Sequence, residues 1–274
     1  MRKVFLLVVV SMSVLISQKA LAATVVVSPS SMDGWAFYNT DNNFTLGAGS
    51  GTYGMVTGPA TPPLGTGSAH MATAAGHGDE EVQLRNGDWA GTPLSAITTL
   101  SYSTYAAAWN GQQDTFLDIY INTSGNAGGG YDDRIIFEPD YGSSDFVAGG
   151  PAPPVLDQWQ TWNVLNGRFY DDNGNGGDGG ANALPWSSFT ALYPNAVLVN
   201  DDGNGGVGGL RITIGAVDPS QSADDYVDNF TIGTAAGSTT YDFEPVPEPG
   251  SLVLGGLMTF ITAAGYRWRH RRKA

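Results

Sequence analysis

The body of the chain alternates apolar and polar residues in short runs, as strands do when one face is buried. The stretches FLDIYI (residues 116–121) and LRITIG (residues 210–215) show this period of two most clearly. Clusters of Gly, Asn, Asp and Pro separate the runs, and these residues favour turns. The pattern predicts twelve strands: Thr24–Val27, Gly34–Tyr38, Gly67–Thr73, Glu80–Leu84, Ile97–Tyr105, Thr115–Ile121, Arg134–Glu138, Gln160–Leu165, Ala196–Val199, Leu210–Ile214, Val227–Ile232 and Thr239–Phe243.

One short helix is expected in the body, around Pro185–Tyr193, because proline is favoured at the first position of a helix. Many strands and one short helix predict an all-β fold. The expected architecture is a two-sheet antiparallel β-sandwich formed by residues 23–243, with a jelly roll favoured over a barrel. The glycine-rich loops follow no regular period, so they are expected as insertions within one domain.

The chain begins like an exported protein. Arg2 and Lys3 precede the apolar run Val4–Ile16, and small residues follow at Ala20–Ala22. This order is typical of a secretory signal peptide, residues 1–22, whose apolar part is helical and which signal peptidase removes after Sec-dependent export. The run is shorter than the ~20 residues of a bilayer span, which favours removal over a retained anchor.

The last residues predict a membrane segment. Ser251–Tyr266 carries no charge, and as a helix it would be about 24 Å long, a thin span of the hydrocarbon core. Five basic residues follow it, and the positive-inside rule keeps such residues in the cytoplasm with the body outside. The sequence therefore predicts a single-pass inner-membrane intermediate with the topology anchor Arg267, Arg269, Arg271, Arg272 and Lys273.

A proline motif precedes the membrane segment. Pro247, Glu248 and Pro249 predict an extended, exposed stretch that a processing enzyme can accept. The order of Pro-Glu-Pro motif, apolar helix and arginine-rich end, within residues 244–274, resembles the PEP-CTERM sorting signal of bacterial surface proteins. The resemblance implies recognition by an exosortase, cleavage near the motif, and transfer to the cell surface or the extracellular matrix of a cell that makes exopolysaccharide.

Composition narrows the function classes. The absence of cysteine excludes disulfides, thiolate metal sites and cysteine nucleophiles. Between the signal peptide and the apolar tail (residues 23–250), four basic residues face 26 acidic ones, a net charge of −22. Such a surface repels nucleic acid and suits divalent cations or neutral sugars. The four basic residues are Arg85, Arg134, Arg168 and Arg211.

Two loops partly match calcium-binding sequences. Asp171, Asn173 and Asn175 occupy the first, third and fifth positions of an EF-hand-type loop, but Asn182 stands where the bidentate Glu belongs. A second partial match contains Asp202, and both stretches also suit ordinary turns. Calcium is the expected cofactor if the body has one.

The end of the body carries a second, weaker resemblance. SADDYVDNFTIG (residues 222–233) and TTYDFEP (residues 239–245) are similar to the final strands of galactose-binding-like and concanavalin-like sandwich domains. That resemblance implies a structural calcium ligand at Asp228, although an Asn follows it where a second Asp is commoner.

No catalytic constellation stands out. Asp79, Glu80 and Glu81 are interpreted as an acidic strand end, with Glu80 pointing away from the other two, and no hydrolase motif is present. The protein is therefore predicted not to be an enzyme. Binding of carbohydrate or exopolysaccharide is the leading hypothesis. The alternatives are a passive structural matrix component and, third, a secreted hydrolase.

Overall fold

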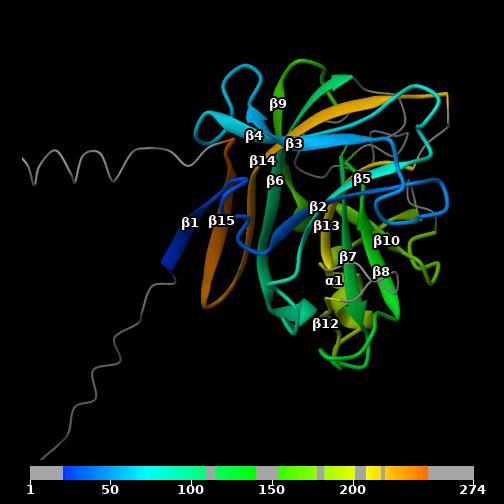
Figure 1. Ribbon diagram of the computed structural model, residues 1–274. Coiled ribbons are helices and arrows are strands. Elements are labelled where there is room, and N and C mark those ends of the chain that lie inside the picture. The colour runs from blue at the N-terminus through cyan, green and yellow to red at the C-terminus, as the bar shows by residue number, and fades with distance from the viewer. Residues whose placement is uncertain are drawn as a thin grey trace, which may run out of the picture.

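The computed structural model describes residues 21–108, 115–139, 154–177, 182–200, 208–216 and 220–245. Two β-sheets dominate these residues, which is compatible with a β-sandwich (Figure 1). Within the described ranges, no helix has the length and apolar character needed to cross a bilayer. Residues 1–20 of the expected signal peptide, the sorting motif, the apolar tail and the basic end lie outside the described residues, whereas Leu21 and Ala22 belong to the first strand.

The first sheet has seven strands in the described part of the chain. The long strand β14 lies at its centre and pairs with β6 on one side and with β4 and then β15 on the other. The edges are formed by β3, β9 and β1. The strands are β1 (Leu21–Val27), β3 (Thr52–Thr57), β4 (Gly67–Thr73), β6 (Ile97–Ala108), β9 (Trp159–Asn163), β14 (Ala223–Thr234) and β15 (Gly237–Phe243).

The second sheet has eight strands in the described part of the chain. Its order is β11-β10-β8-β7-β13-β5-β2, and β12 pairs with β7. The strands are β2 (Trp35–Thr40), β5 (Glu81–Asn86), β7 (Phe116–Asn122), β8 (Asp133–Phe137), β10 (Arg168–Asp171), β11 (Leu184–Pro185), β12 (Val197–Leu198) and β13 (Leu210–Gly215). The helix α1 (Trp186–Leu192) follows β11, and single 3-10 turns lie at Leu94–Ala96 and Val164–Asn166.

The core lies between the two sheets and is built from apolar residues at alternate positions along the strands. Trp35 of β2 anchors one part of it. Its ring contacts Phe230, Tyr241 and Phe243 edge to face, at centroid distances of 5.1–5.3 Å. These aromatic contacts join the eight-stranded sheet to strands β14 and β15 of the other sheet.

The twelve predicted strands all have counterparts in the structure. The predicted helix is confirmed as α1, with Pro185 just before it rather than within it. Three strands were not predicted: β3, β10 and β11. The prediction of wholly antiparallel sheets was wrong at one place, because β1 runs parallel to β15 along the whole length of both strands.

Candidate ligand-binding cavity

The outer face of the eight-stranded sheet, turned away from the core, is polar. On β5, Val82 and Leu84 pack into the core, so Glu81, Gln83 and Arg85 point to the outer face. The neighbouring strands continue this face, because the register pairs Arg85 with Arg211 and Gln83 with Thr213 on β13. On β5 and β13, the residues that alternate with the core positions are polar, and together they form a continuous polar surface.

This polar face contains a partly open cavity of about 170 Å³. Strands β2, β5, β7, β8 and β13 contribute to its wall, together with loop residues. We call this space the cavity and define it by its lining residues: Thr40, Phe44, Glu81, Gln83, Arg85, Tyr120, Tyr131, Arg134, Asp172 and Arg211. Its volume is below the ~300–1,000 Å³ typical of pockets for drug-sized ligands, so it suits only a small group.

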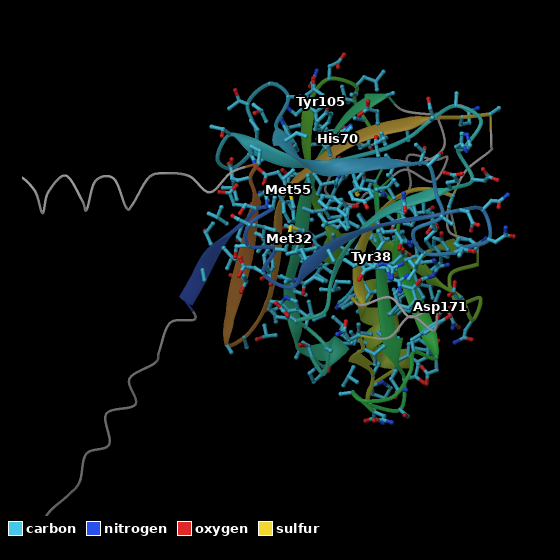
Figure 2. All side chains as sticks on the ribbon, in the orientation of Figure 1. Met32, Tyr38, Met55, His70, Tyr105 and Asp171 are labelled. Atoms are coloured by element: carbon cyan, nitrogen blue, oxygen red, sulfur yellow. The ribbon has the colours of Figure 1, made fainter. Side chains whose placement is uncertain are left out.

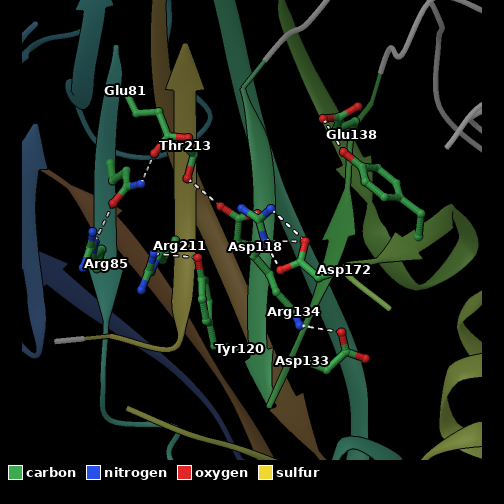
Figure 3. A network of polar contacts seen from close by, with 12 residues as sticks. Glu81, Arg85, Asp118, Tyr120, Asp133, Arg134, Glu138, Asp172, Arg211 and Thr213 are labelled. Carbon is green, nitrogen blue, oxygen red and sulfur yellow. Dashed lines mark hydrogen bonds and ion pairs between the residues drawn. The ribbon is translucent and has the colours of Figure 1, made fainter. Parts of the chain in front are cut away.

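A polar network runs across the strands beneath the cavity (Figure 3). Arg134 is at its centre: Nη2 donates to Asp172 Oδ1 at 2.9 Å, and Nη1 lies 3.5 Å from Asp118 Oδ1. Thr213 donates its hydroxyl to the other Asp118 oxygen at 3.0 Å. Gln83 bridges two neighbours on its own strand, because it donates to the Glu81 carboxyl and accepts from Arg85 Nε.

Two arginines lie over tyrosine rings. The Arg211 guanidinium carbon is 3.7 Å from the centroid of the Tyr120 ring, and its Nη1 donates to the Tyr120 hydroxyl at 2.8 Å. The Arg85 guanidinium carbon is 4.5 Å from the centroid of the Tyr38 ring. Both side chains are almost fully buried. Stacking and burial fix the direction of each guanidinium plane, which preorganises it for a planar partner.

The cavity perturbs the ionisation of one lining carboxyl. Burial raises the pKa of Glu81 to about 7, the nearby charge of Asp118 adds to the rise, and Arg134 opposes it. Glu81 is therefore only partly ionised near neutral pH. Burial also raises the pKa of the Tyr120 hydroxyl, so this group stays protonated.

The rim of the cavity is aromatic. Phe44, in the loop after β2, is 51% exposed, and its φ of 60° is unusual for a bulky residue. The Asp41 carboxylate holds this loop by accepting from the amides of Asn43 and Thr45, at 3.0 and 2.8 Å. Tyr131 is 38% exposed and packs edge to face on Tyr120, at a centroid distance of 5.0 Å.

One hydroxyl in the cavity wall makes no hydrogen bond within the described residues. Thr40 is 1% exposed, and its Oγ1 has no partner there. A buried hydroxyl without a partner costs free energy, typically ~1–3 kcal/mol. Its position in the cavity wall makes it available to a bound group.

The predicted calcium residues of the first loop do come together, at the edge of the sheet near β10 (Figure 2 labels Asp171). Asp171 is buried, and its carboxylate accepts from the Asn175 amide at 2.7 Å, from Asn175 Nδ2 at 2.7 Å and from the Tyr193 hydroxyl at 2.8 Å. The loop is thus closed as a turn around Asp171, which is the ordinary interpretation of the same sequence.

A second carboxyl, which sequence analysis did not propose, lies beside this loop. Asp133 of β8 is 1% exposed, and its Oδ2 has no partner with hydrogen-bond geometry in the described residues. Burial raises the pKa of Asp133 to about 6, the charge of Asp171 adds to the rise, and Tyr193 and Asn173 oppose it. Across the described ranges, no three His, Asp or Glu side chains gather as a metal-ligand group.

The other predicted calcium residue of the described chain, Asp228, has a different environment. Its two oxygens accept from the backbone amides of Leu64 and Phe243, at 2.8 and 3.2 Å. It marks the bulge of β14, where Asn229 has φ 57° and the strand changes partner from β4 to β15. Asp228 therefore ties a loop to the sheet. Asp202 lies outside the described residues.

A glutamate makes a similar tie close to the sorting segment. Glu244 is 1% exposed, accepts from the amides of Thr66 and Gly67 at 2.6 and 3.1 Å, and also accepts from the Thr66 hydroxyl at 3.2 Å. These bonds fix the end of the body immediately before Pro245. Pro247, Glu248 and Pro249 and the basic anchor lie outside the described residues.

Two of the three consecutive acidic residues at the start of β5, Glu80 and Glu81, have different surroundings. Glu80 accepts from the amide and hydroxyl of Ser50, at 2.5 and 2.7 Å, whereas Glu81 is buried in the cavity wall. The interpretation of this stretch as a plain acidic strand end therefore fails for Glu81. The prediction that Glu80 and Glu81 point apart is confirmed.

The cavity has no local sequence signature, because its residues share no motif. Arg85, Arg134 and Arg211 are scattered over three strands, and only the sheet order brings them together. The usable signal was the count: four arginines in a strongly acidic body, three of which line one cavity. Comparison with protein-family models gives no match for this chain, and comparison with curated proteins gives none either.

Proposed function

We propose that this is an exported, membrane-tethered protein of the cell surface or extracellular matrix whose body binds carbohydrate in the cavity. The body would be a jelly-roll sandwich. The C-terminal segment would direct the protein to an exosortase. The observation that carries the binding proposal is the combination of exposed aromatic rings at the rim with buried, fixed polar groups in the wall.

Carbohydrate suits this combination for a physical reason. Sugars present apolar C–H faces, which pack on aromatic rings, and hydroxyls, which need hydrogen-bond partners in fixed positions. Phe44 and Tyr131 supply exposed rings, while Gln83, Thr40 and the guanidiniums supply polar groups. The cavity places exposed rings beside buried polar groups that point into one space, and this combination favours a binding module over a passive matrix component.

The test is glycan binding by the full-length chain in detergent, with variants that remove one hydroxyl each. Thr40→Val keeps the shape of the side chain and removes Oγ1. We expect affinity for the bound glycan to fall about threefold to tenfold, and stability to stay equal or rise, because Thr40 Oγ1 makes no hydrogen bond to the described residues.

Thr73→Val is the matched control. Thr73 is also buried, its Oγ1 also has no hydrogen-bond partner in the described residues, and it lies on β4 of the other sheet. Removal of the Thr73 hydroxyl is expected to leave glycan affinity unchanged. Equal affinity in Thr40→Val and the wild type would show that the glycan binds elsewhere, and binding of no glycan at all would leave the structural matrix role.

A further inference from the structure

We propose that the cavity selects an acidic sugar, a hexuronate, whose carboxylate is held among Arg85, Arg134 and Arg211 while its ring packs against Phe44. This inference rests on the proposed carbohydrate function and names the class of sugar. It also replaces the expectation of neutral sugars, which came from the net charge of the whole body.

The distribution of charge carries the argument. Residues 23–250 contain 26 acidic and four basic residues, yet three guanidiniums and only two carboxyls line the cavity, with Asp118 buried beneath it beside Arg134. One of the two lining carboxyls, Asp172, accepts from both Nε and Nη2 of Arg134. Three of the four arginines of these residues are thus gathered at one place, where they offset the repulsion that the acidic remainder would exert on a carboxylate.

The geometry of the guanidiniums supports a carboxylate in particular. The guanidiniums of Arg85 and Arg211 lie over the rings of Tyr38 and Tyr120, and hydrogen bonds from Arg85 Nε to Gln83 and from Arg211 Nε to the Gly208 carbonyl oxygen hold them in place. A guanidinium held in a fixed position attracts a carboxylate by its charge and donates charge-assisted hydrogen bonds. The preorganisation reduces the entropy that binding has to remove.

The backbone of the rim indicates a function for Phe44. A bulky residue at φ 60° is held at a cost, and the Asp41 turn maintains it. The result is an exposed ring at the mouth of the cavity, in the place where the apolar face of a sugar would lie if its carboxylate reached the arginines.

The same arrangement makes binding depend on pH. As Glu81 ionises, it adds negative charge to the cavity wall, so affinity for an anionic sugar falls between pH 6 and pH 8. We expect a loss of about tenfold. The charged and titratable groups around Glu81 are Arg85 on its own strand, Arg211 on β13, Asp118 and Tyr120 on β7, Arg134 on β8, Asp172 after β10 and Tyr38 on β2.

The experiment titrates the full-length chain in detergent with glucuronate, galacturonate, glucose, galactose and glucose 6-sulfate, by calorimetry at low salt. We expect at least one uronate to bind at least about tenfold more tightly than its neutral counterpart. Arg85→Gln should remove this preference. Arg168→Gln is the matched control, because Arg168 lies outside the cavity lining and donates to the Ala183 carbonyl oxygen.

A second variant keeps the test decisive if Arg85→Gln does not fold. Glu81→Gln should retain at pH 8 the uronate affinity that the wild type has at pH 6. Equal affinity for uronates and neutral sugars would overturn the inference and leave the carbohydrate function standing. Preference for the sulfated sugar alone would overturn the carboxylate assignment, and no binding of any sugar would remove both proposals.

Discussion

Glu81→Gln tests whether a buried carboxyl weakens the fold when it ionises. Burial raises the pKa of Glu81 from its ordinary 4.5 to about 7 in the folded protein. The folded state therefore holds the proton up to a higher pH than the unfolded state does. The contribution of Glu81 to stability is therefore most favourable below about pH 4.5. It falls as the pH rises, and above about pH 7 the whole contribution has been lost.

The size of the effect follows from the pKa values. A rise of about 2.5 corresponds to about 3 kcal/mol, at about 1.4 kcal/mol for each pH unit. Glutamine keeps the size of the side chain and the oxygen that accepts from Gln83 Nε2. We therefore expect Glu81→Gln to match the wild type near pH 4.5 and to exceed its free energy of unfolding by up to about 3 kcal/mol at pH 8.

Urea unfolding of the full-length chain in detergent at pH 5, 6, 7 and 8, followed by tryptophan fluorescence, measures this difference. Asp133 and Asp228 also have raised pKa values, and their effect cancels between variant and wild type. Glu80→Gln is the control. Burial raises the pKa of Glu80, but hydrogen bonds from Ser50 outweigh burial and lower this pKa overall, so Glu80→Gln should lose stability at pH 8. Parallel pH profiles for Glu81→Gln and the wild type would refute the reasoning.

Four other predictions concern separate parts of the molecule. Phe44→Gly should raise the free energy of unfolding by about 1 kcal/mol, because glycine relaxes the positive φ, and should weaken glycan binding. Phe44→Ala should weaken glycan binding without this gain in stability. Urea unfolding measures the stability and calorimetry measures the binding. Asp133→Asn should be about 2 kcal/mol more stable than the wild type at pH 8, because burial raises the pKa of Asp133 to about 6, and equal urea midpoints at pH 8 would contradict this. Glu244→Ala should cost about 3 kcal/mol of unfolding free energy, because it leaves the buried amides of Thr66 and Gly67 without acceptors, and an unchanged urea midpoint would contradict this. Glu248→Ala or Pro249→Ala should keep the full-length protein in the membrane fraction on immunoblots, and normal release would contradict the sorting role.

Much of the fold follows from residue periodicity, and the site does not. The alternation in FLDIYI identifies Leu117, Ile119 and Ile121 as core residues, and the structure buries all three. The same alternation assigns Asp118 and Tyr120 to the other face. It cannot say that β13 and β8 are the neighbours of β7, because strand order depends on contacts far apart in the sequence.

The strands that were missed have weak local patterns for identifiable reasons. Gly54 interrupts β3, and β10 has only four residues before the Asp171 turn. The parallel pairing of β1 and β15 leaves no sequence signal, because alternation is the same for either direction. The Asp171 loop could be identified because Asp171, Asn173 and Asn175 lie close in sequence, whereas Asp133 belongs to another strand and has no such signal.

The pairing of β1 with β15 determines when the body can become complete. Among the described strands, β15 is the sheet neighbour of β1, and β15 also supplies Tyr241 and Phe243 to the cluster around Trp35. At about 5–20 residues per second, the ribosome needs about 10–40 s to make the residues between Val27 and Gly237. For that time the stretch Val25–Val27 has no partner strand, so the first sheet is completed only after synthesis has reached β15.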